Sequence, residues 1–144
     1  MTVGLALRRI AAASALAIVT SSAAHAQDKR AFDGTWLVLF SCIAAPDGAA
    51  GYTLKYLASV QDGLLHGENG VRGREGSLSL DGPIMPDGSA VLLATGLTAD
   101  SRYNVGRAPP MSAVNYHIQA RFQATRGTGK RMELRSCEAV FTKQ

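Results

Sequence analysis

The chain has 144 residues, a formal net charge of +4 and a hydrophobic fraction of 47%. Two of the 15 basic residues and none of the 11 acidic ones precede residue 27, which leaves a net charge of +2 on residues 27–144. That length fits one domain with a single modest core, and so balanced a charge excludes nucleic acid as the expected partner.

The first 26 residues have the order of a secretory signal peptide. Arg8 and Arg9 come first, an apolar run covers 10–19, and Ala24-His25-Ala26 provides a cleavage site before Gln27. The apolar run is too short to span a bilayer permanently, and no later segment is long enough. The sequence therefore predicts a signal peptide over 1–26, one domain over 27–144, a periplasmic or secreted location, and no transmembrane segment in the mature chain.

Cys42 and Cys137 are the two cysteines of the chain, and both belong to the mature part. In an exported protein such a pair most often forms a disulfide, because the compartment is oxidising. The bond would tie the first structured segment to the last. Two free buried thiols are the alternative.

Turn signals recur at short intervals through the mature chain. Five of its seven aspartates precede glycine, and Asn69-Gly70 adds a similar pair. Aspartate or asparagine followed by glycine favours tight turns that need positive φ. Between these turns, apolar and polar residues alternate, most cleanly at 52–61 and 113–124, as in strands with one buried face.

The alternation predicts seven strands, with a further short one near 83–85 or 101–105. The predicted ranges are 34–43, 52–61, 64–71, 76–81, 89–97, 113–124 and 130–142. Short connections favour antiparallel neighbours, and closing the sheet removes exposed edges. The expected fold is an all-β, antiparallel up-and-down barrel of seven to eight strands. A β-sandwich is the competing architecture, and an outer-membrane barrel is disfavoured because the chain is short for eight spanning strands.

One connection, from Thr98 to Ser112, is longer than the others. It contains Arg102, Arg107 and Pro109-Pro110. Long loops at the end of a barrel often carry binding residues, although a solvated excursion would have the same composition. The later segment 126–131 has basic residues and glycines but lacks the spacing of a phosphate loop, so it is interpreted as a hairpin turn.

Titratable residues do not form a recognisable catalytic or metal-binding pattern. His66 and His117 fall on different predicted strands and are expected at the surface. Glu133 and Glu138 are close in the sequence, but a spacing of five places them on opposite faces of one strand. No metal or cofactor is therefore expected, and a hydrolase using these glutamates is the weakest hypothesis.

Aromatic residues occupy the apolar phase of several predicted strands. They are Trp36, Phe40, Tyr52, Tyr56, Tyr116 and Phe122. Pointing inward, they either fill the barrel or line a cup with hydroxyl groups. The candidate ligand-binding residues are Trp36, Tyr52, Tyr56 and Tyr116, together with Arg102 and Arg107 of the long loop.

The segment Phe32-Asp33-Gly34-Thr35-Trp36 resembles the start of calycin-type barrels, the lipocalins and avidins, whose first strand carries Gly-x-Trp. The same start, together with the ending from Arg126 to Phe141, resembles uncharacterised small secreted proteins of bacteria, for which no activity is implied. The calycin resemblance implies an up-and-down barrel and a ligand cup with Trp36 near its closed end. It implies no biotin contacts, and the C-terminal helix usual in lipocalins is not expected here.

These observations favour an exported, non-catalytic barrel that binds a small apolar or amphipathic ligand. The alternative is a secreted protein-interaction module, such as a protease inhibitor or an envelope-associated factor, that uses the loop at 98–112. The sequence does not predict an oligomeric state.

Overall fold

A computed structural model describes residues 28–144, so the predicted signal peptide and its cleavage site lie outside the described residues. Within this part of the chain no helix is long and apolar enough to cross a membrane. Eight strands form the fold. They are β1 (Gly34–Cys42), β2 (Tyr52–Gln61), β3 (Leu64–Asn69), β4 (Leu78–Pro83), β5 (Ser89–Leu97), β6 (Ala113–Phe122), β7 (Arg126–Arg131) and β8 (Cys137–Lys143).

The strands form one closed barrel in which each strand pairs with the next and β8 returns to β1. All eight pairings are antiparallel. The predicted up-and-down barrel is therefore confirmed, and the sandwich is excluded. Cys42 and Cys137 are register partners at the β1–β8 seam and form the predicted disulfide, with an S–S distance of 2.05 Å.

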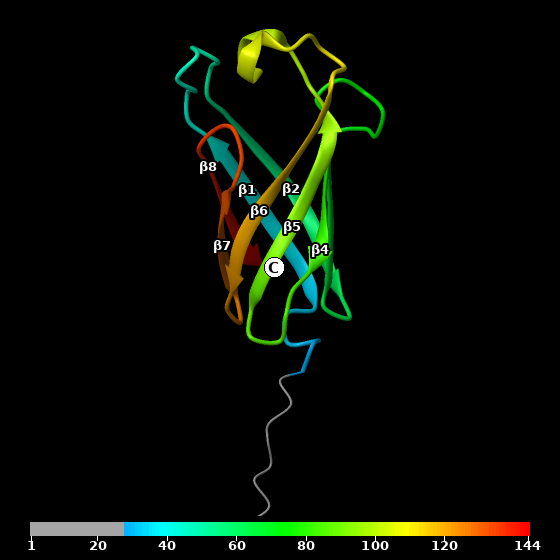
Figure 1. Cartoon of the computed structure of the whole chain (residues 1–144). Helices are drawn as coiled ribbons and strands as arrows, with labels where there is room; N and C mark the ends of the chain where they lie inside the picture. Colours follow the sequence, from blue (N-terminus) through cyan, green and yellow to red (C-terminus); the bar gives the residue numbers. More distant parts are fainter. Residues whose placement is uncertain (1–27) are drawn as a thin grey trace, which may run out of the picture.

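The two ends of the barrel differ (Figure 1). One end carries the segment at 28–33 and three tight turns, at 62–63, 84–88 and 123–125. We call it the closed end. The opposite end carries the longer loops at 43–51, 70–77, 98–112 and 132–136, and we call it the open end.

Side chains from all strands pack inside the barrel, because alternate positions of each strand point inward. At the closed end Trp36 is fully buried, its ring lies edge-on to Phe122, and its Nε1 donates a hydrogen bond to the carbonyl of Phe32 at 2.8 Å. Phe141 packs against Phe122 with ring centroids 4.7 Å apart. The closed end is therefore a packed aromatic core.

The C-terminal part of the chain differs from the prediction. A single strand over 130–142 is wrong, because β7 ends at Arg131 and β8 begins at Cys137. The predicted hairpin turn over 126–131 is also wrong, since that segment is β7. Its glycines face the interior, where a Cβ on Gly127 would lie 2.9 Å from the Phe122 ring and one on Gly129 would lie 2.8 Å from Ile118. The absence of side chains in a crowded core, not a turn, explains these glycines.

The remaining strands begin and end within two residues of their predicted ranges. Near 83–85 the structure has an isolated bridge between Ile84 and Ala90. Near 101–105 it has short 3-10 helices, η1 (Ser101–Tyr103) and η2 (Val105–Arg107), instead of a strand.

Candidate functional site

A cavity of about 400 Å³ lies at the open end, between the upper strand ends and the loops at 98–112 and 132–136. We call it the open-end cavity. Its size falls in the range of small-molecule sites. Its apolar lining consists mainly of Leu54, Leu78, Leu97, Val105, Val114 and Leu134, and its polar lining mainly of Tyr52, Tyr103, Asn104, Tyr116, Arg131 and Arg135.

The loop at 98–112 is a folded cover for this cavity. Asn104 donates from Nδ2 to the carbonyls of Ala99 and Ala108, which holds the loop together. The loop at 43–51 anchors it, because the amide of Ala50 donates to the carbonyl of Arg102 and Asp47 accepts a hydrogen bond from the amide of Gly106. These bonds give the long connection a defined shape above the barrel.

Three tyrosines line the open-end cavity from different sides. Tyr116 on β6 is buried, and its ring stacks on Phe40 with centroids 5.8 Å apart. Tyr52 on β2 meets Tyr103 of the cover edge-on at 6.4 Å. Burial raises the pKa of the Tyr116 phenol above its usual value, so this hydroxyl stays neutral at physiological pH.

Arg131 ends β7 and takes the inward phase of that strand, opposite Ile118 of β6. Its guanidinium carbon lies 3.8 Å from the centre of the Tyr116 ring, a cation–π contact. Its Nε is buried without a hydrogen-bond partner. Burial is the main cause of a lowered pKa at this side chain, although an arginine remains protonated at any physiological pH.

Arg135, which also lines the cavity, connects three segments of the chain. This side chain is 5% exposed, and its guanidinium donates to the carbonyls of Ile43, Ala50 and Tyr103. Three segments that are distant in sequence therefore meet at one arginine. The open-end cavity holds these two arginines and no carboxylate among the residues that line it, so the charged side chains of its lining are all positive.

The structure separates the six predicted ligand-binding residues. Tyr52 and Tyr116 line the open-end cavity. Trp36 lies in the packed core of the closed end, as the calycin resemblance implied for its position, and is not part of the lining. Tyr56 lies one inward position deeper than the lining residue Leu54, and its buried hydroxyl has no partner.

The two predicted loop arginines stay outside the cavity lining. Arg102 lies over the ring of Tyr103 at 4.7 Å, and Arg107 follows Gly106 in η2. Sequence reasoning missed Arg131 and Arg135, because both fall in segments that were interpreted as a turn and as a continuous strand. The spacing of Gly127, Gly129 and Arg131 by two residues was the available signal for an inward arginine.

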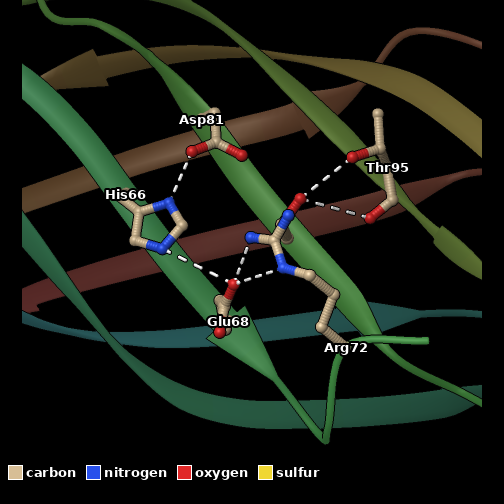
Figure 2. A network of polar contacts seen from close by, with 6 residues as sticks. His66, Glu68, Arg72, Asp81 and Thr95 are labelled. Carbon is tan, nitrogen blue, oxygen red and sulfur yellow. Dashed lines mark hydrogen bonds and ion pairs between the residues drawn. The ribbon is translucent and has the colours of Figure 1, made fainter. Parts of the chain in front are cut away.

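The predicted surface histidines are half-exposed, and each contacts a carboxylate. Figure 2 shows the surroundings of His66. His66 on β3 lies between Asp81, at 2.5 Å from Nδ1, and Glu68, at 3.7 Å from Nε2. Arg72 pairs with the same Glu68. The hydroxyl of Ser79 lies nearby, but it is hydrogen-bonded to the hydroxyl of Thr95 at 2.9 Å and not to the histidine. The cluster thus crosslinks the outer wall of the barrel without an activated nucleophile.

His117 and Glu133 form a second pair, at 2.7 Å from Nδ1. Glu133 also accepts from the backbone amide of His117, and this bond is the main reason that the pKa of Glu133 is lowered. The expectation that Glu133 and Glu138 share one strand is wrong, since Glu133 lies in the loop at 132–136. Among residues 28–144, no group of three or more histidine, cysteine or acidic side chains could hold a metal ion.

A larger hollow of about 590 Å³ lies outside the barrel, over β5 to β8. Its lining includes outward polar side chains such as Gln119, Arg121, Lys130 and Glu138. It is a groove on a convex wall, whereas the open-end cavity is formed by inward side chains and a folded cover. We therefore assign the candidate site to the open-end cavity.

Comparison of this chain with protein-family profiles, with curated proteins and with solved structures finds no match. The site is therefore interpreted from its geometry.

Proposed function

We propose that the chain is an exported, non-catalytic barrel protein that binds a small amphipathic ligand in the open-end cavity. The observation that carries the proposal is a cavity of about 400 Å³ with apolar walls and a few polar groups at one end of a closed barrel. Such a combination is typical of small-molecule sites, in which apolar area supplies affinity and polar groups set orientation.

The division of the barrel into two zones supports this role. The aromatic core at the closed end and the disulfide at the seam provide stability. The open end can then keep side chains that do not pack fully. Export fits the disulfide, because such bonds persist in oxidising compartments. The eight-stranded up-and-down arrangement is also that of calycin-type barrels, and we propose that kinship on the fold and on the Gly34-Thr35-Trp36 start.

A protein-interaction role is the second candidate, because large apolar side chains are exposed around the mouth of the cavity. Ile43 is 68% exposed, Met132 is 57% exposed and Leu134 is 76% exposed. The loops that carry Ile43 and Leu134 are joined by Arg135, which follows Leu134 and donates to the carbonyl of Ile43. A partner protein could bury these side chains in a contact with the rim.

Titration of the mature protein with N-phenyl-1-naphthylamine, an uncharged apolar dye, tests the ligand-binding role. We expect saturable binding of one dye per chain with a rise in its fluorescence. Val114→Phe should reduce the affinity at least about tenfold, because the added ring occupies the cavity that Val114 lines.

Leu57→Phe is the matched control. Leu57 points outward from β2 and is 58% exposed, so its substitution should leave dye binding unchanged. Equal binding by both variants would place the dye elsewhere on the molecule. No dye binding by the parent protein would favour the protein-interaction role, which predicts instead a loss of partner binding on Leu134→Ser.

A further inference from the structure

The charged side chains that line the open-end cavity indicate which class of ligand it binds. Its two charged side chains are both arginines, and Arg135 is committed to three backbone carbonyls. Arg131 is different, because among residues 28–144 its side chain makes no hydrogen bond and no ion pair; its Nε is buried without a partner, as is the Nε of Arg135. The nearest glutamate in sequence, Glu133, is bonded to His117.

We propose that the cavity binds a ligand with an apolar body and a terminal carboxylate, and that Arg131 binds this carboxylate. The inference rests on the proposed function and adds the charge of the ligand. The buried Nε of Arg131 lacks the hydrogen bond that it has in water. An acceptor that enters the cavity with the ligand restores this bond.

The contact of Arg131 with Tyr116 favours a carboxylate as that acceptor. The guanidinium carbon lies 3.8 Å from the centre of the Tyr116 ring, and a cation–π contact of this kind uses none of the five N–H donors. These donors form a planar fork that matches the two oxygens of a carboxylate, which can accept two parallel hydrogen bonds.

The rest of the lining fits the apolar body. Leu54, Leu78 and Val114 lie on three different strands and turn their side chains into the same space. A molecule with its carboxylate at Arg131 would cover these side chains with its hydrocarbon part. Arg135 already donates to three backbone carbonyls, so a second carboxylate on the ligand would have no free guanidinium in the lining, and a monocarboxylate is the class that the lining suits.

Calorimetric titration with octanoate, octanamide and octylamine tests this inference on the unmodified mature protein. The three probes share a hydrocarbon chain and differ in charge. We expect octanoate to bind about tenfold to a hundredfold more tightly than octanamide, the range for hydrogen bonds to a charged group, and octylamine to bind most weakly. Equal affinity for octanoate and octanamide would overturn the inference and leave the proposed function standing.

A pair of variants assigns the preference to one residue. Arg131→Met should abolish the preference for octanoate over octanamide, because the carboxylate loses the only guanidinium of the lining whose side chain makes no hydrogen bond to residues 28–144. Lys130→Met removes a cation from the same strand, but Lys130 is exposed on the outer face, so the preference should remain. If Arg131→Met keeps the preference, Arg131 is not the carboxylate site. If no probe and no dye binds the parent protein, the proposed function fails together with the inference.

Discussion

The disulfide at the barrel seam offers a quantitative test of how this fold is stabilised. Cys42 and Cys137 are 95 residues apart in sequence and register partners in the barrel. Their bond therefore closes most of the mature chain into one loop, even in the unfolded state. On the chain-entropy estimate, a crosslink across about 95 residues raises the free energy of unfolding by about 4.7 kcal/mol.

We expect Cys42→Ala/Cys137→Ala to fold to the same barrel, because hydrogen bonds between β1 and β8 run from the Trp36–Lys143 pair to the cysteines themselves. Its free energy of unfolding should fall by about 4–5 kcal/mol. The dependence of that free energy on urea should also steepen, since the unfolded chain without the crosslink exposes more surface.

Urea titration followed by the fluorescence of Trp36 measures both quantities. Reducing agent should weaken the parent protein and leave the double variant unchanged, which provides the control. A loss below about 1 kcal/mol would refute the reasoning, because it would show that the crosslink does not restrict the unfolded chain as the loop length requires.

Three further predictions concern the core and its turns. Trp36→Ala should lower the free energy of unfolding by about 3–5 kcal/mol in urea titrations, since the indole is fully buried; a loss below about 1 kcal/mol would contradict that packing. Gly129→Ala should cost about 1–3 kcal/mol in the same assay, because its Cβ would lie 2.8 Å from Ile118, and a neutral result would show that β7 can move outward. Asp33 has a lowered pKa, chiefly because it accepts a hydrogen bond from the amide of Gly63, so its stabilising effect is present above about pH 4 and is lost as the pH falls through its folded pKa. Thermal melts at pH 7 and pH 3 should therefore show a smaller acid-induced drop in Tm for Asp33→Asn than for the parent, and equal drops would contradict this account.

The sequence predicted the barrel because its signals are local. Alternation at 52–61 and 113–124 set the inward faces, and aspartate-glycine pairs marked turns. Closure followed from the need to pair edge strands, and the two cysteines pointed to the same seam. Each of these inferences needs only a few neighbouring residues and one physical rule.

The open-end cavity could not be predicted in the same way. Its lining comes from separate strands and from the loop at 98–112, and only the assembled barrel brings them together. Arg131 was missed because Gly127 and Gly129 hide the alternation of β7: both are inward positions without side chains. Trp36 was predicted both near the closed end and as a ligand-binding residue, and only the assembled structure shows that the packed core at that end lies outside the cavity lining.

The most direct test of ligand binding at the open end is a titration of the isotopically labelled mature protein with octanoate, followed by amide and indole NMR signals. Trp36 is the single tryptophan of the chain, so its indole N–H gives one unambiguous signal from the closed end. We predict that the amides of Tyr52, Tyr116 and Arg131 shift while the Trp36 indole does not. Shifts confined to the outer groove over β5 to β8, or no shifts at all, would contradict the account.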